Sequence, residues 1–181
     1  MIRLRTFGTL DLRNSEGSEL RAVLAQTRRL ALLVYLAVAS PRGFHRRDKL
    51  LALFWPDQAT DRARAALSRA IYFLRRELGH EVLLSRSDEE IGLNPERFWC
   101  DASAFEDALE NQHFRQALEL YRGDILPGFF ASEAAGFEEW LEQERARLKE
   151  RASVAAWMLA ADEEKAGNLA QAAQWARRGV D

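Results

Sequence analysis

The sequence predicts an α+β amino-terminal domain at residues 1–97, followed by an all-α helical domain at residues 98–181. Apolar residues alternate with a period of two near the amino terminus, whereas the period is helical from Asp101 onward. The charge also changes sign, because residues 1–98 hold 17 Lys and Arg against 12 Asp and Glu, and residues 99–181 hold 9 against 16. A basic half joined to an acidic half indicates different partners, with polyanions as candidates for the first.

The composition is typical of a folded protein of a reducing compartment. Hydrophobic residues make up 48% of the chain and aromatic residues 10%. Cys100 is the single cysteine, so no internal disulfide can form. The amino terminus has no signal-peptide pattern, and the longest apolar run, Leu30 to Ala39, is about half the length of a membrane span. We therefore expect a soluble, cytoplasmic protein with no membrane partner.

The first domain is expected to open with a small antiparallel sheet. Residues 2–7 and 10–13 alternate apolar and polar side chains, which is typical of strands. A turn cluster at Asn14–Ser18 leads to residues 19–23, which are expected to supply a third short strand.

Three helices and a hairpin are expected next. The helices are predicted from Gln26 or Thr27 to about Ala39, from Arg46 to Phe54, and from Thr60, as N-cap, to Leu78. Strands at 82–86 and 91–93 then form a hairpin. A sheet, three helices and a hairpin in this order are the elements of a winged helix-turn-helix.

The third helix, at about 60–78, has two opposed faces. At 100° per residue, one aliphatic stripe gathers Leu67, Ile71, Leu74 and Leu78. The opposite face carries no acid and presents Arg62, Ala65, Arg69, Tyr72 and Arg76. A solvated helix usually mixes both signs of charge, whereas an arginine-bearing helix fits the major groove and its Arg side chains can bind guanine O6 and N7. The pattern therefore predicts that this helix binds double-stranded DNA.

Basic residues also surround the start of the second helix. Arg46, Arg47 and Lys49 are expected to contact the phosphates beside the major groove, because residues 42–76 hold 9 basic residues against 3 acidic ones. The hairpin tip, residues 88–90, is acidic, which disfavours contact of the wing with the minor groove, and Arg86 is the one basic residue of the hairpin that is placed to make it.

Two groups of motifs point to one known family. The first comprises residues 47–57 (RDKLLALFWPD) and 63–79 (ARAALSRAIYFLRRELG), and the second comprises residues 99–106, 120–129 and 137–148. The first group resembles the DNA-binding half of the SARP type (antibiotic regulatory protein) of bacterial transcriptional activators. The second resembles their bacterial transcriptional activator domain, which is built from tetratricopeptide-like helices. The resemblance implies an activator that binds direct repeats near a promoter, as two copies side by side, and helps to recruit RNA polymerase.

An internal repeat agrees with a helical-repeat domain. Residues 114–122 (FRQALELYR) align without gaps to residues 169–177 (LAQAAQWAR). Small residues at fixed positions let stacked helices approach closely, so Ala117 and Ala172 are expected at equivalent tight positions. We expect more repeats of this kind to follow Asp181.

Two other classes of function were weighed against DNA binding. An enzyme is disfavoured, because the sequence has no glycine-rich phosphate loop, no Cys or His pair at metal spacing and no serine in a nucleophile elbow. Neither a cofactor nor a metal is therefore expected. The alternative is a protein–protein adaptor that uses a winged helix and helical repeats without binding DNA, and salt-dependent binding to bare duplex DNA would separate the two.

Overall fold

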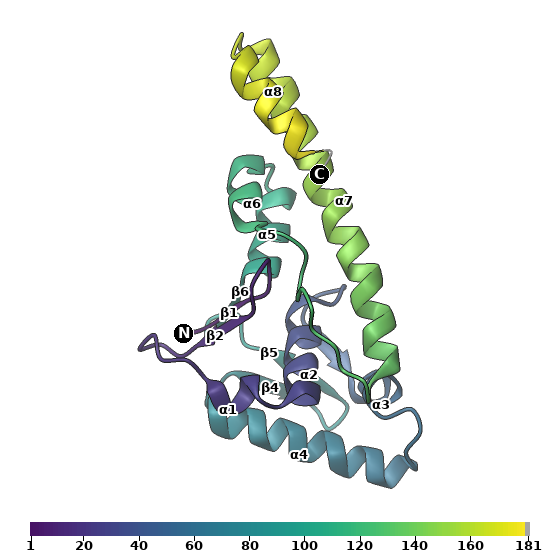
Figure 1. Ribbon diagram of the computed structural model, residues 1–181. Helices are drawn as coiled ribbons and strands as arrows, with labels where there is room; N and C mark the ends of the chain where they lie inside the picture. The colour runs from purple at the N-terminus through teal and green to yellow at the C-terminus, as the bar shows by residue number, and fades with distance from the viewer. Residues whose placement is uncertain (180–181) are drawn as a thin grey trace. The chain divides into compact units, whose positions relative to one another are not determined.

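The structure is a computed structural model that describes residues 1–179 (Figure 1), so residues 180–181 of the expected repeat domain lie outside it. The chain divides into two compact units. The first comprises residues 1–5, 11–100 and 128–141, and the second comprises residues 6–10, 101–127 and 142–181. The expected boundary at residue 97 gave each domain one continuous segment. In this division, residues 6–10 belong to the second unit and residues 128–141 belong to the first.

The amino-terminal sheet has a different third strand from the expected one. Strand β1 (Ile2–Arg5) pairs antiparallel with β2 (Asp11–Arg13) and parallel with β6 (Phe98–Cys100). The expected strand at 19–23 is wrong, because only an isolated bridge joins Glu19 to Arg13, and the chain then turns into helix α1 (Arg21–Leu24).

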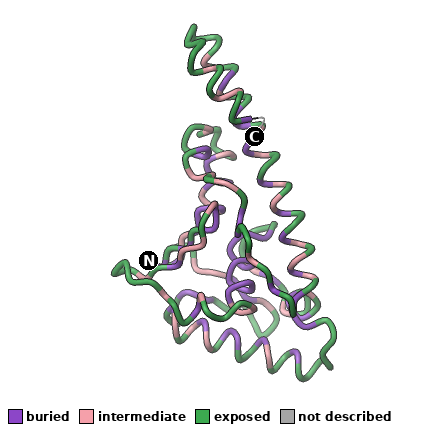
Figure 2. The backbone as a smooth tube through the Cα atoms, in the orientation of Figure 1, coloured by how far each residue is buried: buried purple, intermediate pink, exposed green. Residues whose placement is uncertain are grey.

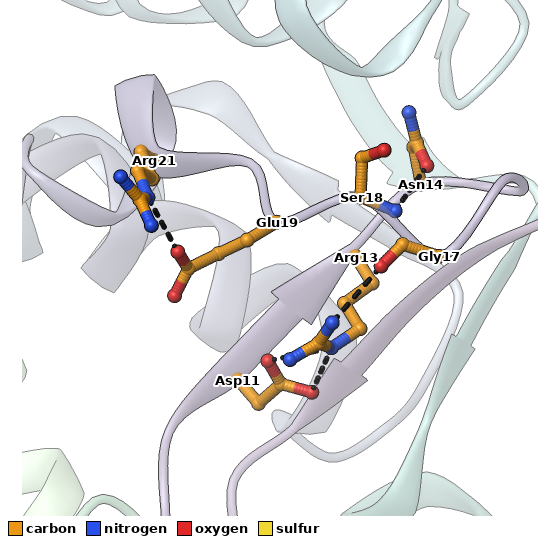
Figure 3. A network of polar contacts seen from close by, with 7 residues as sticks. All are labelled: Asp11, Arg13, Asn14, Gly17, Ser18, Glu19 and Arg21. Carbon is orange, nitrogen blue, oxygen red and sulfur yellow. Dashed lines mark hydrogen bonds and ion pairs between the residues drawn. The ribbon is translucent and has the colours of Figure 1, made fainter.

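A turn held by side chains explains why the pairing stops at Glu19. The Asn14 side chain accepts hydrogen bonds from the backbone N–H groups of Glu16 and Ser18, at 3.0 and 2.9 Å. Arg13 binds Asp11 at 3.0 Å and the Gly17 carbonyl at 2.9 Å, across the same turn (Figure 3). The α1 helix then buries Val23 completely, and this apolar burial offsets the loss of strand pairing.

The three main helices of the first unit are confirmed, with small changes at their starts. They are α2 (Thr27–Val38), α3 (Arg47–Phe54) and α4 (Thr60–Leu78). Thr60 was expected to be the N-cap of α4, but it is the first helical residue. The N-cap is Ala59, whose side chain has no oxygen. Arg46 does not begin α3, because it ends a strand that the sequence pattern did not predict, β3 (Phe44–Arg46).

The hairpin of the first unit is confirmed and belongs to a three-stranded sheet. Strand β5 (Glu90–Leu93) lies between β3 and β4 (Leu83–Arg86) and is antiparallel to both. Gly92 is required for this close pairing, because a Cβ atom there would lie 2.5 Å from the Gly43 carbonyl oxygen. The predicted wing is therefore present and is tied to the segment before α3.

The first turns of helix α7 (Ala135–Lys165) contribute to the core of the first unit. The Phe137 side chain is fully buried, and its ring centroid lies 5.5 Å from that of Phe54. The Trp140 ring centroid lies 4.8 Å from that of Tyr35 on α2. Burying aromatic rings of this size stabilises a small domain strongly, so residues 135–141 act as part of the winged helix.

The second unit is built from helices α5 (Asp101–Glu110), α6 (Phe114–Leu120), the rest of α7, and α8 (Leu169–Arg178). Figure 2 shows the buried positions along α5, α6 and α7 as purple stretches of the tube. Residues 101–179 contain no strand, and their one β-bridge is the isolated one that joins Ile125 to Phe7. This agrees with the expected all-helical character.

Buried charges hold the second unit together. Glu106 on α5 is only 4% exposed and its carboxylate binds Arg147 at 3.0 Å and Arg151 at 2.6 Å, both from α7. Arg147 also binds Glu144, and these hydrogen bonds raise the pKa of its guanidinium above the ordinary value. Because the Glu106 carboxylate is buried, loss of both arginines would leave it without an ion pair, which is the costly case for a buried charge.

The internal repeat is visible in the backbone of two interhelical turns, 55 residues apart. The α5–α6 turn has hydrogen bonds from His113 N–H to the Ala108 carbonyl (2.8 Å) and from Gln112 N–H to that of Leu109 (3.0 Å). The α7–α8 turn repeats both, from Asn168 to Glu163 (2.8 Å) and from Gly167 to Glu164 (3.0 Å). The expectation for the two alanines is met only in part, because Ala117 is fully buried and Ala172 half-buried.

The two turns suggest a stabilising substitution. Gln112 and Gly167 occupy the same turn position and have φ of 59° and 81°, a left-handed conformation that costs about 1 kcal/mol for a residue other than glycine. Gln112→Gly is therefore expected to raise the free energy of unfolding by up to about 1 kcal/mol, and Gly167→Ala to lower it by a similar amount. Urea denaturation of both variants checks this, and a loss of stability in Gln112→Gly would contradict the assignment.

Candidate nucleic-acid interface

The faces predicted for the third helix are found on α4. The aliphatic stripe is confirmed as core, since Leu67, Ile71, Leu74 and Leu78 are all buried. The five residues expected on the opposite face are all exposed: Arg62, Ala65, Arg69, Tyr72 and Arg76. Tyr72 is 66% exposed, which is unusual for an aromatic side chain in the middle of a helix. The structure thus presents one continuous exposed face of cations around a small residue and a tyrosine.

The arginines of this face differ in how freely they can bind a partner. Arg62 and Arg69 make no hydrogen bond, ion pair or ring contact with any part of the chain that the structure describes. Arg76 is already neutralised, because it binds Glu77 at 2.6 Å and lies 5.3 Å from the Phe73 ring centroid. The unneutralised positive charge is therefore concentrated in the first half of α4.

Residues at the start of α3 fall into two groups. Arg46 and Lys49 are exposed; Arg46 lies 3.9 Å from Asp48, and Lys49 lies 5.9 Å from the Tyr35 ring. Arg47 is half-buried, and its Nε atom is buried without a hydrogen-bond partner in residues 1–179. Burial, and to a lesser extent the nearby Arg75, lowers the pKa of Arg47, although Asp88 opposes the shift. Arg46 and Lys49 are thus better placed than Arg47 to reach a polyanion.

The wing is fixed to α4 rather than free. Arg75 donates hydrogen bonds from α4 to the Leu83 carbonyl, at 3.2 and 3.1 Å, and to the Ser85 hydroxyl at 3.0 Å. Arg86 is held on the wing itself, because it binds Glu90 at 2.6 Å and lies 4.7 Å from the Phe44 ring centroid. This ion pair occupies the one basic side chain that was expected to reach the minor groove.

Sequence reasoning missed two exposed residues on the flank of α4 toward the wing. Arg64 and Ser68 line a pocket of about 310 Å³ with residues that include Arg47, Asp88 and Glu89. Arg64 has no partner among residues 1–179, so it adds a third unneutralised cation to α4. The helical wheel places Arg64 between the arginine face and the core stripe, and this position was the signal in the sequence that could have identified it.

Residues 1–179 hold no group of three or more His, Cys, Asp or Glu side chains that could hold a metal ion. Within the same residues, no helix is both long enough and apolar enough to cross a membrane.

The geometry defines a class of fold, a winged helix-turn-helix joined to paired helices. A solved structure with this fold is Mycobacterium tuberculosis EmbR in complex with a low-affinity phosphopeptide, which this chain matches with a TM-score of 0.53. The two are 17% identical in sequence, and the match covers 98% of this chain and 55% of the EmbR chain. At this level of identity the likeness shows the fold alone, and the present chain spans little more than half of EmbR. No family model and no curated protein matches the sequence.

Proposed function

We propose that the protein is a sequence-specific, double-stranded DNA-binding regulator that activates transcription at bacterial promoters, with α4 in the major groove. The exposed arginine face of α4 carries this proposal. Arg62, Arg64 and Arg69 lack ion-pair partners in residues 1–179, and the one exposed acid on the helix, Asp61, lies at its first turn. Leaving three cations without counter-charges along one helix favours a polyanionic partner.

Each exposed residue can be given a role in this complex. Arg62 and Arg69 would contact base edges, where the Arg fork matches guanine, and Ala65 lets the helix approach a thymine methyl. Tyr72 and Arg76 would bind sugar and phosphate farther along the helix. Arg46 and Lys49 would bind flanking phosphates, whereas the half-buried Arg47 would contribute through the field of its charge. Arg86 would approach the minor groove only after leaving Glu90.

The partners of the complex follow the resemblance of both halves of the chain to SARP-type activators. Two copies would bind direct repeats side by side, and the helical unit would contact RNA polymerase. The alternative function, a protein–protein adaptor, would use the same arginine face for an acidic protein surface. Binding of bare duplex DNA with a preference for one sequence distinguishes the two, because an adaptor requires neither.

Selection from a pool of random duplexes, followed by titration of the selected sequence in increasing salt, tests the proposal. We expect one enriched motif and a plot of log affinity against log salt with a slope of about −3 or steeper, since each phosphate contact contributes about −0.9. The double variant Arg46→Ala with Lys49→Ala is expected to flatten that slope by about 2. Failure to enrich any motif, with weak binding that salt does not affect, would favour the adaptor.

A further inference from the structure

A pocket of about 500 Å³ lies at the start of α2, within the first unit. Its walls come from residues 25–29, from Trp55, from one side of α4 and from residues 130–134. The charged side chains in its lining are Arg28, Arg29, Arg69 and Glu133, so cations outnumber acids by three to one. The proposed contacts with DNA involve Arg69 but not Arg28, Arg29 or Glu133.

The start of α2 adds unsatisfied donors to this pocket. The helix has no side-chain N-cap and no acid in its first turn, where the helix dipole favours negative charge. Arg28 and Arg29 occupy that turn instead. The backbone N–H groups of Thr27, Arg28 and Arg29 have no acceptor within the helix, and none is found elsewhere in residues 1–179.

The arginines are held in place but only partly neutralised. Arg28 binds the Glu133 carboxylate at 2.7 Å and its carbonyl oxygen at 2.8 Å, while the Arg28 Nε atom is buried without a partner in the described chain. The Arg29 guanidinium lies 4.1 Å from the Phe73 ring centroid and has no ion pair within residues 1–179. Within residues 1–179, Glu133, whose side chain is 77% exposed, is therefore the one acid that pairs with an arginine of this pocket.

We propose that this pocket binds a phosphate group. Arg forks and free backbone N–H groups at a helix start together match its charge and its several acceptor oxygens. The phosphate can come from a free phosphorylated molecule, whose remainder would lie against Trp55 and the exposed Phe130, or from the backbone of bound DNA. Only the second source rests on the proposed function. In either case Glu133 occupies part of the site and competes with the phosphate for Arg28.

Two substitutions with opposite expected effects test the proposal. Calorimetric titration of the 181-residue chain with inorganic pyrophosphate, and a parallel titration with the selected duplex, are compared among variants. Arg29→Gln removes a charged donor and is expected to weaken binding roughly ten-fold. Glu133→Gln removes the competing carboxylate and is expected to strengthen binding several-fold. Arg21→Gln, at an 87% exposed arginine that pairs with Glu19 outside the pocket, is the control and should change neither affinity.

The two titrations distinguish the sources of phosphate. Opposite shifts in pyrophosphate affinity identify a free ligand, and they would stand even if the chain bound no DNA. Opposite shifts in DNA affinity alone identify a backbone phosphate. The proposal is overturned if Glu133→Gln strengthens binding of neither ligand, or if a folded Arg29→Gln weakens binding of neither. Since Glu133 is mostly exposed, its variant is expected to fold and keeps the test decisive even if Arg29→Gln loses stability.

Discussion

Replacing Arg69 by alanine is expected to weaken binding to the selected duplex by roughly ten-fold or more, with little change in the thermal unfolding midpoint. Arg69 is exposed on α4 and has no partner in residues 1–179, so its loss removes no hydrogen bond, ion pair or ring contact among them. A bidentate contact between Arg and guanine is worth about 1–3 kcal/mol, and its loss also relaxes the preference at that base. Gel-shift titrations against the selected sequence and single-base variants measure both effects.

Two further arginines provide controls for Arg69→Ala. Arg76→Ala is expected to have a smaller effect that is equal for all sequences, because Arg76 already pairs with Glu77 at 2.6 Å. Arg3→Ala, at an exposed arginine of β1 that is not part of the arginine face, is expected to change affinity little. If Arg69→Ala bound the duplex as tightly as the unsubstituted protein, the assignment of α4 as the DNA-reading helix would be wrong.

The second large effect concerns stability and is expected at Asp101. Its carboxylate is buried and accepts hydrogen bonds from the Thr6 backbone at 2.8 and 2.9 Å, from the Thr6 hydroxyl at 2.7 Å and from the Phe7 backbone at 3.1 Å. Asp101→Ala would leave these donors unsatisfied inside the second unit. We expect the free energy of unfolding to fall by about 3 kcal/mol or more, because hydrogen bonds to a charged acceptor are worth about 1.5–3 kcal/mol each and are not additive.

Urea denaturation with two comparison variants isolates the role of the Asp101 carboxylate. Asp101→Asn keeps the shape and one acceptor oxygen, so it should lose less stability than Asp101→Ala. Glu119→Ala removes an exposed acid from α6 of the same unit and should have a small effect. Equal losses in Asp101→Ala and Glu119→Ala would show that the network around Thr6 does not stabilise the unit.

The features that the sequence predicted correctly are local. Periodic apolar residues specify α2, α3 and α4, because a helix buries one face whatever it packs against. The same reasoning places Leu67 and Leu74 in the core and Arg62 and Arg69 at the surface. The two-residue period with a polar tip likewise specifies the β4–β5 hairpin.

The features that the sequence did not predict depend on contacts between distant residues. Strand β6 pairs with β1 across more than 90 residues, and no local pattern marks Phe98 as the partner of Ile2. Residues 135–141 join the first unit because Phe137 meets Phe54, although they lie within a continuous helix. Arg47 was expected to contact phosphates at the surface, yet the wing partly covers it. The carbonyl oxygen of Glu89 on the wing accepts a hydrogen bond from the Arg47 backbone N–H.

Binding of α4 in the major groove, with contacts to guanine, can be tested by methylation interference. Dimethyl sulfate modifies N7 of guanine in the major groove and N3 of adenine in the minor groove, so the two grooves are distinguished in one experiment. We expect that N7 methylation of specific guanines in the selected duplex blocks binding, and that Arg69→Ala loses sensitivity at one of these guanines. Interference at adenine N3 alone, or an N7 pattern that Arg69→Ala leaves unchanged, would contradict this mode of binding.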